Sequence, residues 1–154
     1  ILLLDVIEHV NDPELFMKNL YDKISKNEKV EILISTGNVS FIIIRLMLLF
    51  GSFNYGKRGI LDKTHTRLFT FNTFKNLILG SNFKIIDIVG IPCPFPIVLK
   101  SKLINKILMN VNSFFIFFSK SVFSYQMFFK IKPSPSLELL LEKAQKKYGK
   151  NNIN

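Results

Sequence analysis

Three ionisable residues lie close together near the start of the chain, in the segment Asp5-Val6-Ile7-Glu8-His9-Val10. They follow a run of apolar residues typical of a buried strand, and ligands bind at the carboxyl ends of strands in an open parallel sheet. A neutral imidazole at His9 could act as a general base near pH 7, with a nearby carboxylate to orient it. The alternative is a capping cluster that only satisfies the loop after the strand.

An alternating order of strands and helices is expected to position this cluster. The apolar run Ile1–Ile7 predicts a parallel strand covered on both faces, and Lys29–Ser35 predicts a second strand. Between them, Asp12, Pro13 and Glu14 mark a helix start. Asp caps free backbone N–H groups, Pro suits the first turn, and Glu favours the positive helix end. The order strand, helix, strand implies a parallel sheet and an α/β fold.

The remainder of the chain predicts a long loop and further regular elements. Residues 39–50 predict a short apolar helix, and residues 51–69 form a loop longer than an ordinary connector, which suggests a functional lid. Thr70 is expected to cap a helix over residues 71–80. The buried face of that helix is expected to hold Phe74, Leu77 and Ile78. The later expected elements are strands over Phe83–Val89 and Val122–Lys132 and helices over Ser101–Phe118 and residues 137–148.

Composition and charge exclude several classes of protein. The 154 residues are 48% hydrophobic and 21% charged, which excludes a disordered chain. The single cysteine, Cys93, excludes a disulfide framework and makes a reducing, cytoplasmic setting the default expectation. The net charge is +10, and residues 91–154 hold ten lysines against two acids. Because the whole chain has only three arginines, we expect no specific nucleic-acid partner.

Two apolar stretches raise the question of membrane contact. Phe41–Phe50 is too short to cross a bilayer and carries Arg45 in its middle. The stretch from Ile104 to Phe129 is interrupted by asparagines and lysines and is too polar for a span. We expect a buried helix beside a sheet in this second stretch. The alternative is peripheral membrane contact, with nearby lysines toward the headgroups.

Two segments resemble a known enzyme family. Residues 5–13, DVIEHVNDP, are similar to the motif at the fourth strand of class I S-adenosylmethionine-dependent methyltransferases. Residues 54–70, NYGKRGILDKTHTRLFT, resemble the branch of that superfamily found beside bacterial glycosyltransferase and polysaccharide genes. The likeness continues in the family's order through SNFKIIDIVGIPCPFPIVL and FSYQMFFKIKP, and covers residues 1–135. Residues 136–154 are then expected to form a C-terminal amphipathic helix and basic tail.

The resemblance implies a partial Rossmann-like sandwich, a sheet with flanking helices. The family's strand order is 3-2-1-4-5-7-6, with the seventh strand antiparallel. Strands 4, 5, 6 and 7 would be Ile1–Ile7, Lys29–Ser35, Phe83–Val89 and Val122–Lys132. The family's glycine-rich loop after strand 1 and its acidic residue after strand 2 have no counterpart here. Because the sequence starts with Ile1 in a strand, without the basic segment of a signal peptide, we expect the C-terminal part of a longer methyltransferase.

The resemblance also implies roles for the ionisable cluster. Asp5 and Val6 would border the methionine end of the cofactor S-adenosylmethionine. Glu8 and His9 would face the acceptor, with His9 as the base that takes the proton of a hydroxyl. In some relatives an acid-x-x-Glu-His set binds magnesium, and Asp5, Glu8 and His9 have that spacing. The leading residue here is the shorter Asp in place of Glu, and we assign no metal ligand.

The second motif lies in the predicted lid. Asp62, His65 and Arg67 would contact the acceptor, although the same residues could instead form a helix-capping network next to Thr70. The sequence therefore predicts methyl transfer to a hydroxyl of a small molecule or glycan. The alternatives are a non-catalytic truncated remnant or interaction module, and peripheral membrane attachment through residues 101–132.

Overall fold

The computed structural model describes residues 1–27, 29–94, 102–135, 140, 141 and 145. In chain order the elements are β1 (Leu2–Leu4), the 3-10 helix η1 (Ile7–His9), α1 (Pro13–Ile24), β2 (Ile32–Gly37), α2 (Ile42–Leu49), α3 (Phe71–Gly80), β3 (Phe83–Ile91), α4 (Lys102–Phe118), α5 (Lys120–Phe123) and β4 (Gln126–Pro133). Of the predicted helix over residues 137–148, only residues 140, 141 and 145 are described, and these are helical. The rest of it, and most of the predicted segment 136–154, lies outside the described residues.

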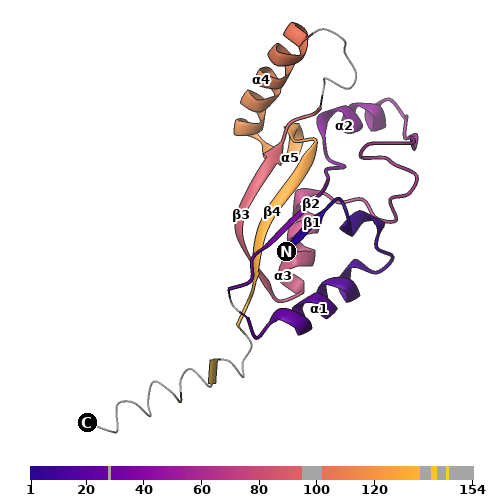
Figure 1. Cartoon of the computed structure of the whole chain (residues 1–154). Helices are drawn as coiled ribbons and strands as arrows, with labels where there is room; N and C mark the ends of the chain where they lie inside the picture. The colour runs from indigo at the N-terminus through magenta and orange to yellow at the C-terminus, as the bar shows by residue number, and fades with distance from the viewer. Residues whose placement is uncertain (28, 95–101, 136–139, 142–144, 146–154) are drawn as a thin grey trace.

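The four strands form one mixed sheet in the order β1-β2-β4-β3 (Figure 1). β1 and β2 are parallel, whereas β4 runs antiparallel between β2 and β3. This arrangement confirms an α/β fold and the predicted neighbours of the four strands, including the antiparallel last strand. Both β2 and β3 extend two residues beyond their predicted ends. β4 begins later than predicted because the residues before it form α5.

The main core lies between one face of the sheet and helices α1 and α3 (Figure 1). Directly paired residues on neighbouring strands share a face, and the row Leu3, Ile34, Phe129 and Ile88 faces this core. Phe74 of α3 is fully buried there, and its ring centroid lies 5.1 Å from that of Phe129. Burial of such apolar side chains is the main favourable term in folding.

Helices α1 and α3 begin where their capping residues predict. The Asp12 carboxylate accepts a hydrogen bond of 2.9 Å from the Leu15 backbone N–H, and so caps α1. Thr70 and Thr73 form a reciprocal capping box at the start of α3. Asn82, with a φ of +62°, follows the end of α3 in the left-handed conformation that stops a helix. The buried residues of α3 are those predicted: Phe74, Leu77 and Ile78.

The first strand is shorter than predicted and is covered on one face only. It ends at Leu4 because Asp5 adopts a φ of +52°, which interrupts the extended backbone, and Ile7 belongs to η1. Leu3 packs against the core, whereas Leu2 and Leu4 are 65% and 50% exposed. The prediction of a strand through Ile7, covered on both faces, is therefore wrong.

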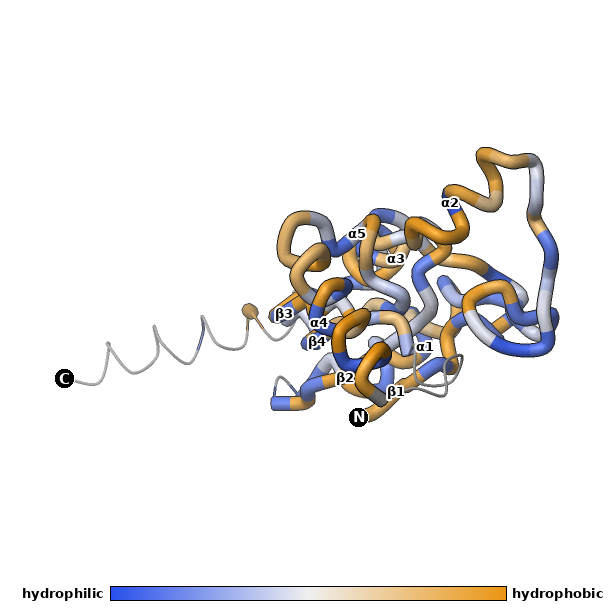
Figure 2. Tube along the Cα trace, turned by 90° about the horizontal axis from the view of Figure 1, so that it is seen from above, coloured by the Kyte–Doolittle hydropathy of each residue, from blue (hydrophilic) through white to orange (hydrophobic). Residues whose placement is uncertain are grey.

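Helix α2 and the long loop after it form a second, smaller core. Figure 2 shows α2 as a mostly hydrophobic segment at one side of the molecule. Its flanking residue Phe41 and its own Ile44 pack against Ile60 and Leu61 of the loop. The predicted loop between α2 and α3 is therefore anchored by apolar contacts at its middle. No helix in the described part of the chain is long and apolar enough to cross a membrane.

Helix α4 forms as predicted, but it is not buried beside the sheet. Its buried residues are Asn105, Asn112 and Ile116, so its polar side faces the protein. The Asn112 amide accepts from the Cys93 backbone N–H and donates to the Phe123 carbonyl, both at 2.9 Å. Figure 1 shows α4 beyond the ends of β3 and β4, away from α1 and α3. The α4 apolar face is defined here by eight exposed side chains: Leu103, Ile104, Ile107, Val111, Phe114, Phe115, Phe117 and Phe118.

The buried and exposed phenylalanines give a test of where stability resides. Phe74→Ala, in the main core, is expected to lower the free energy of unfolding by about 3–5 kcal/mol because it removes a fully buried ring and leaves a cavity. The matched change Phe117→Ala, at a side chain that is 85% exposed, should cost less than about 0.5 kcal/mol. Urea unfolding of both variants is the measurement. Equal losses would contradict the assigned core.

Candidate functional site

A pocket of about 320 Å³ lies at the carboxyl ends of the parallel strands β1 and β2. Residues from four places in the sequence meet there: the β1–α1 turn, the end of β2, the long loop and the start of β4. The lining residues are Asp5, Glu8, His9, Gly37, Arg58, Gly59, Ile60, Asp62, His65, Tyr125 and Gln126. The pocket therefore gathers five of the predicted site residues: Asp5, Glu8, His9, Asp62 and His65.

Backbone hydrogen bonds hold the long loop against the end of β1. The Glu8 carbonyl accepts from the backbone N–H groups of Thr66, at 2.8 Å, and Arg67, at 3.2 Å. The Thr66 hydroxyl lies 3.0 Å from the same carbonyl oxygen and 2.9 Å from that of Val10. These contacts join residues more than 50 positions apart and place His65 beside the β1–α1 turn.

Glu8 is the buried ionisable group of the pocket. Its side chain is 3% exposed, and in the described part of the chain its Oε2 has no hydrogen-bond partner. Burial raises the pKa of this carboxyl above its ordinary value, with a smaller contribution from the charge of Asp5. Hydrogen bonds from its own backbone N–H and from Thr36, together with the nearby His65, offset part of that increase. Within the described residues, the pocket thus contains a buried carboxyl oxygen without a hydrogen-bond partner.

Two imidazole rings stand next to Glu8. His9 and His65 pack edge to face, with ring centroids 4.8 Å apart. His9 Nδ1 lies 3.1 Å from the Thr64 carbonyl oxygen, and His65 Nδ1 lies 2.9 Å from that of Ile60. Since a carbonyl oxygen only accepts, Nδ1 carries the proton in each ring, and Nε2 of the neutral ring is an acceptor. Both rings therefore have a fixed tautomer.

Asp5 belongs to the pocket but has different partners from Glu8. Its Oδ1 accepts a hydrogen bond of 3.0 Å from the Ser35 hydroxyl and a short one from the Gln126 amide. The structure therefore does not form the Asp5, Glu8 and His9 set that the magnesium-binding spacing suggested. Val6 precedes η1 and does not line the pocket, so its predicted cofactor contact is not brought there.

Asp62 lines the pocket and forms a local turn, whereas the cap of α3 is formed by Thr70 and Thr73. Its Oδ1 accepts from the Thr64 backbone N–H at 2.8 Å and from the Thr64 hydroxyl at 2.9 Å, which closes a tight turn. These hydrogen bonds, and to a smaller extent the nearby His65 and His9, hold the pKa of the Asp62 carboxyl below its ordinary value. Asp62 is therefore a turn-forming residue that also gives the pocket a negative charge.

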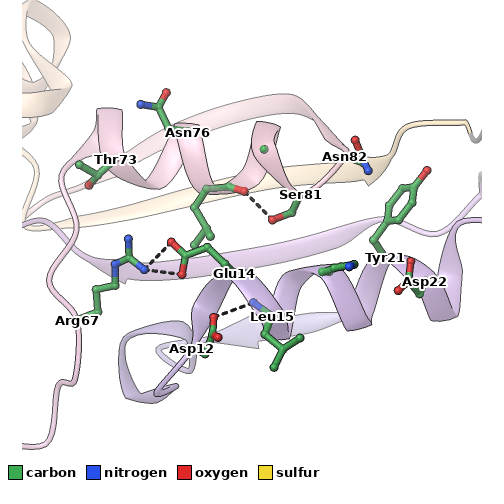
Figure 3. Close-up of a pocket in the computed structure, with 13 residues that line it drawn as sticks. Asp12, Glu14, Leu15, Tyr21, Asp22, Arg67, Thr73, Asn76, Ser81 and Asn82 are labelled. Atoms are coloured by element: carbon green, nitrogen blue, oxygen red, sulfur yellow. Dashed lines mark hydrogen bonds and ion pairs between the residues drawn. The ribbon is translucent and has the colours of Figure 1, made fainter.

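Arg67 lies outside this pocket, in a larger groove of about 780 Å³ between α1 and α3 (Figure 3). Its guanidinium contacts both carboxylate oxygens of Glu14 at 2.6 Å and stands over the Phe69 ring, 5.5 Å from the centroid. The ion pair is about half exposed and so contributes little to stability. Although this groove is larger, the convergent ionisable groups, one of them buried, lie in the smaller pocket, which we take as the candidate site.

Sequence analysis missed the residues that the last strand brings to the pocket. Gln126 pairs with Gly37, so the start of the antiparallel β4 lies at the carboxyl end of β2. Tyr125 precedes it, and burial raises the pKa of the Tyr125 hydroxyl. Gly59 has a φ of +94°, and a Cβ there would lie 2.9 Å from that hydroxyl. The available signal was the polar pair Tyr125 and Gln126 directly before the apolar run of residues 127–129.

The fold and pocket together define an α/β protein with an ionisable site at the carboxyl edge of its parallel strands. No protein-family model matches the sequence, and no curated protein matches it either. The chemical groups of the site themselves indicate which reactions it can support. A buried carboxyl and two oriented imidazoles can accept a proton, bind a cation or position a hydroxyl.

The hydroxyl of Thr66 gives a test of how the long loop is held. Thr66→Val should lower the free energy of unfolding by about 0.5–1.5 kcal/mol, because the hydrogen bond to the Glu8 or Val10 carbonyl is lost. It should also speed amide hydrogen exchange in the loop around His65. Thr66→Ser keeps the hydroxyl and should lose much less of both. If the two variants exchange at the same rate, the hydroxyl does not hold the loop.

Proposed function

We propose that the protein catalyses methyl transfer from S-adenosylmethionine to a hydroxyl of a small molecule or glycan, as the C-terminal part of a class I methyltransferase domain. The observation that carries this proposal is the sheet order β1-β2-β4-β3 with β4 antiparallel. It equals the order 4-5-7-6 of the family that the sequence resembles. The ionisable pocket at the end of β1 supports the proposal, because the resembling motif lies there.

The residues of this chain fit one end of the cofactor. S-adenosylmethionine, when bound, supplies a methyl group on a positively charged sulfur. Asp5 lines the pocket and keeps acceptor capacity beyond its hydrogen bonds to Ser35 and Gln126, which suits the ammonium of the methionine end. The ribose and adenine have no assigned partners in these 154 residues, because the glycine-rich loop and the following acid have no counterpart in the sequence.

His9 is the proposed base for the acceptor hydroxyl. Its ring lines the pocket, and its Nδ1–H donates to the Thr64 carbonyl, which leaves Nε2 to take the proton. The neighbouring carboxyl of Glu8 would stabilise the imidazolium that forms. Asp62 and His65 complete the wall on the loop side, where the acceptor would be aligned.

The proposed base gives the direct test of this function. His9→Gln should lower kcat for methyl transfer by about 100-fold or more, because proton removal in the transition state is lost. Affinity for S-adenosylmethionine should change little, since His9 faces the acceptor. The measurement is transfer of tritiated methyl groups to oligosaccharides and small phenols by the protein expressed from its complete reading frame.

A matched control separates the base from a general effect of substitution. Lys75→Gln, at an exposed position of α3, should methylate at the wild-type rate. If His9→Gln does as well, the base assignment is wrong. If the wild-type protein labels none of the hydroxyl acceptors, the proposed function is wrong.

The α4 apolar face favours a second function, attachment to the surface of an anionic membrane. A helix in water normally turns its apolar side inward, whereas α4 buries Asn105 and Asn112 beside Ile116 and exposes most of its leucines, isoleucines and phenylalanines. Residues 102–123 hold three lysines and no acidic residue, which complements anionic headgroups. An apolar face flanked by lysines is the composition of helices that lie in the membrane interface.

Vesicle binding tests this attachment. Sedimentation with phosphatidylcholine vesicles should increase strongly when phosphatidylglycerol is added, and Phe117→Asp should remove most of it. The control Leu79→Asp, at an exposed leucine of α3, should bind like the wild type. Binding that ignores the anionic lipid would contradict the attachment. A dimer that Phe117→Asp dissociates would instead assign the α4 apolar face to a second copy of the chain.

A further inference from the structure

The pocket contains three potential metal ligands within reach of a single ion. Glu8, His9 and His65 each offer one ligand atom, and these atoms all lie within 4.8 Å of one another. Two of the residues come from η1, and the third comes from the long loop. The group forms because the loop is tied to the Glu8 carbonyl through Thr66 and Arg67. This group differs from the acid-x-x-Glu-His set of the sequence motif, because His65 and not Asp5 is its third member.

The surroundings of both imidazoles are those of metal ligands. A histidine that binds a metal usually donates its other ring N–H to a carbonyl or carboxylate, which fixes the ring and its tautomer. His9 and His65 make this contact with the backbone carbonyls of Thr64 and Ile60, at 3.1 and 2.9 Å. Each neutral ring then has its Nε2 lone pair available. Two oriented rings so close together would repel each other if both were protonated, but both can bind one cation.

The side chain of Glu8 gives independent support for a bound cation. Its Oε2 is buried and has no hydrogen-bond partner in the described part of the chain. A buried polar atom without a partner costs free energy, and native structures rarely leave one without a functional reason. Burial also raises the pKa of this carboxyl, so the site as it stands disfavours the charged form. A bound cation would supply the missing partner and stabilise the carboxylate.

We propose that Glu8, His9 and His65 bind one divalent transition-metal ion, with Zn²⁺ or a similar ion of mixed nitrogen and oxygen preference as the natural occupant. Two imidazoles and one carboxylate match the donor preference of such ions, whereas Mg²⁺ prefers oxygen donors in strict octahedral geometry. Three protein ligands leave further coordination positions open toward the pocket. The set therefore resembles a catalytic metal site more than a closed structural one.

A bound ion would restrict the methyl acceptors that the pocket can take. This restriction rests on the proposed function. A metal that polarises an oxygen lowers the pKa of a bound water or hydroxyl. With His9 as a ligand, its Nε2 would not be free to act as the base. The ion would instead lower the pKa of the acceptor hydroxyl, whose proton would pass to water. The acceptor would then present an oxygen that can coordinate a metal, as a sugar or phenol hydroxyl does. Metal binding itself is independent of methyl transfer and is tested separately.

Titration of the metal-free protein with Co²⁺ and with Zn²⁺ tests the site. We expect one Co²⁺ per chain with visible absorption bands of a nitrogen and oxygen site, and one Zn²⁺ by calorimetry. Glu8→Gln, His9→Gln and His65→Gln should each weaken binding by at least about 10-fold. Because His9 and His65 are the two histidines of the chain, no other imidazole can replace them. Glu14→Gln and Cys93→Ser are the controls and should bind as the wild type does.

Thermal unfolding guards against loss of structure in the variants. Zn²⁺ should raise the unfolding midpoint of the wild-type protein and of Glu14→Gln, and should raise that of folded Glu8→Gln clearly less at the same Zn²⁺ concentration. Glu8→Gln removes the buried charge without changing the size of the side chain, so we expect it to fold. Wild-type binding by the three pocket variants, or no bound metal at all, would overturn the inference. Methyl transfer that persists in metal-free protein would overturn the metal's role in the reaction while leaving the proposed function intact.

Discussion

The site depends on one small set of hydrogen bonds, those that the Glu8 carbonyl accepts from residues 66 and 67. These hydrogen bonds hold the later part of the loop between α2 and α3, whose apolar middle is anchored separately where Ile60 and Leu61 pack on α2. With these hydrogen bonds in place, His65 stands against His9, and Asp62 faces the same pocket. A loop fixed at both points behaves as a wall of the site, which is what a preorganised binding site requires.

The antiparallel β4 is the second constraint, because it decides which residues border the pocket. Because β4 runs antiparallel to β2, it starts at the edge of the sheet where β2 ends. Gln126 therefore lies at the end of β2 and forms a hydrogen bond with Asp5. The same pairing carries Phe129 into the main core, against Phe74. One strand therefore links the core to the site: Gln126 at its start borders the pocket, and Phe129 further along packs in the core.

Local chemistry in the sequence was enough to predict where α1 and α3 begin, whereas the order of the strands was expected only from the family resemblance. Asp12 and Thr70 cap α1 and α3 because capping depends on residues within one turn. The early end of β1 could not be predicted in this way, since it follows from the left-handed turn at Asp5, whose side chain bonds Ser35 and Gln126. Helical periodicity likewise predicted α4 but not its orientation, which is set by long-range bonds of Asn112.

The division between fold and site also has an energetic side. The main core under α1 and α3 consists of apolar side chains, and none of the described pocket-lining residues belongs to it. Glu8 instead lowers stability, because its buried Oε2 has no hydrogen-bond partner among the residues that the structure describes. Proteins tend to keep such costs where function requires them. The burial of Glu8 beside two oriented imidazoles is therefore better explained by a ligand of the pocket than by the needs of the fold.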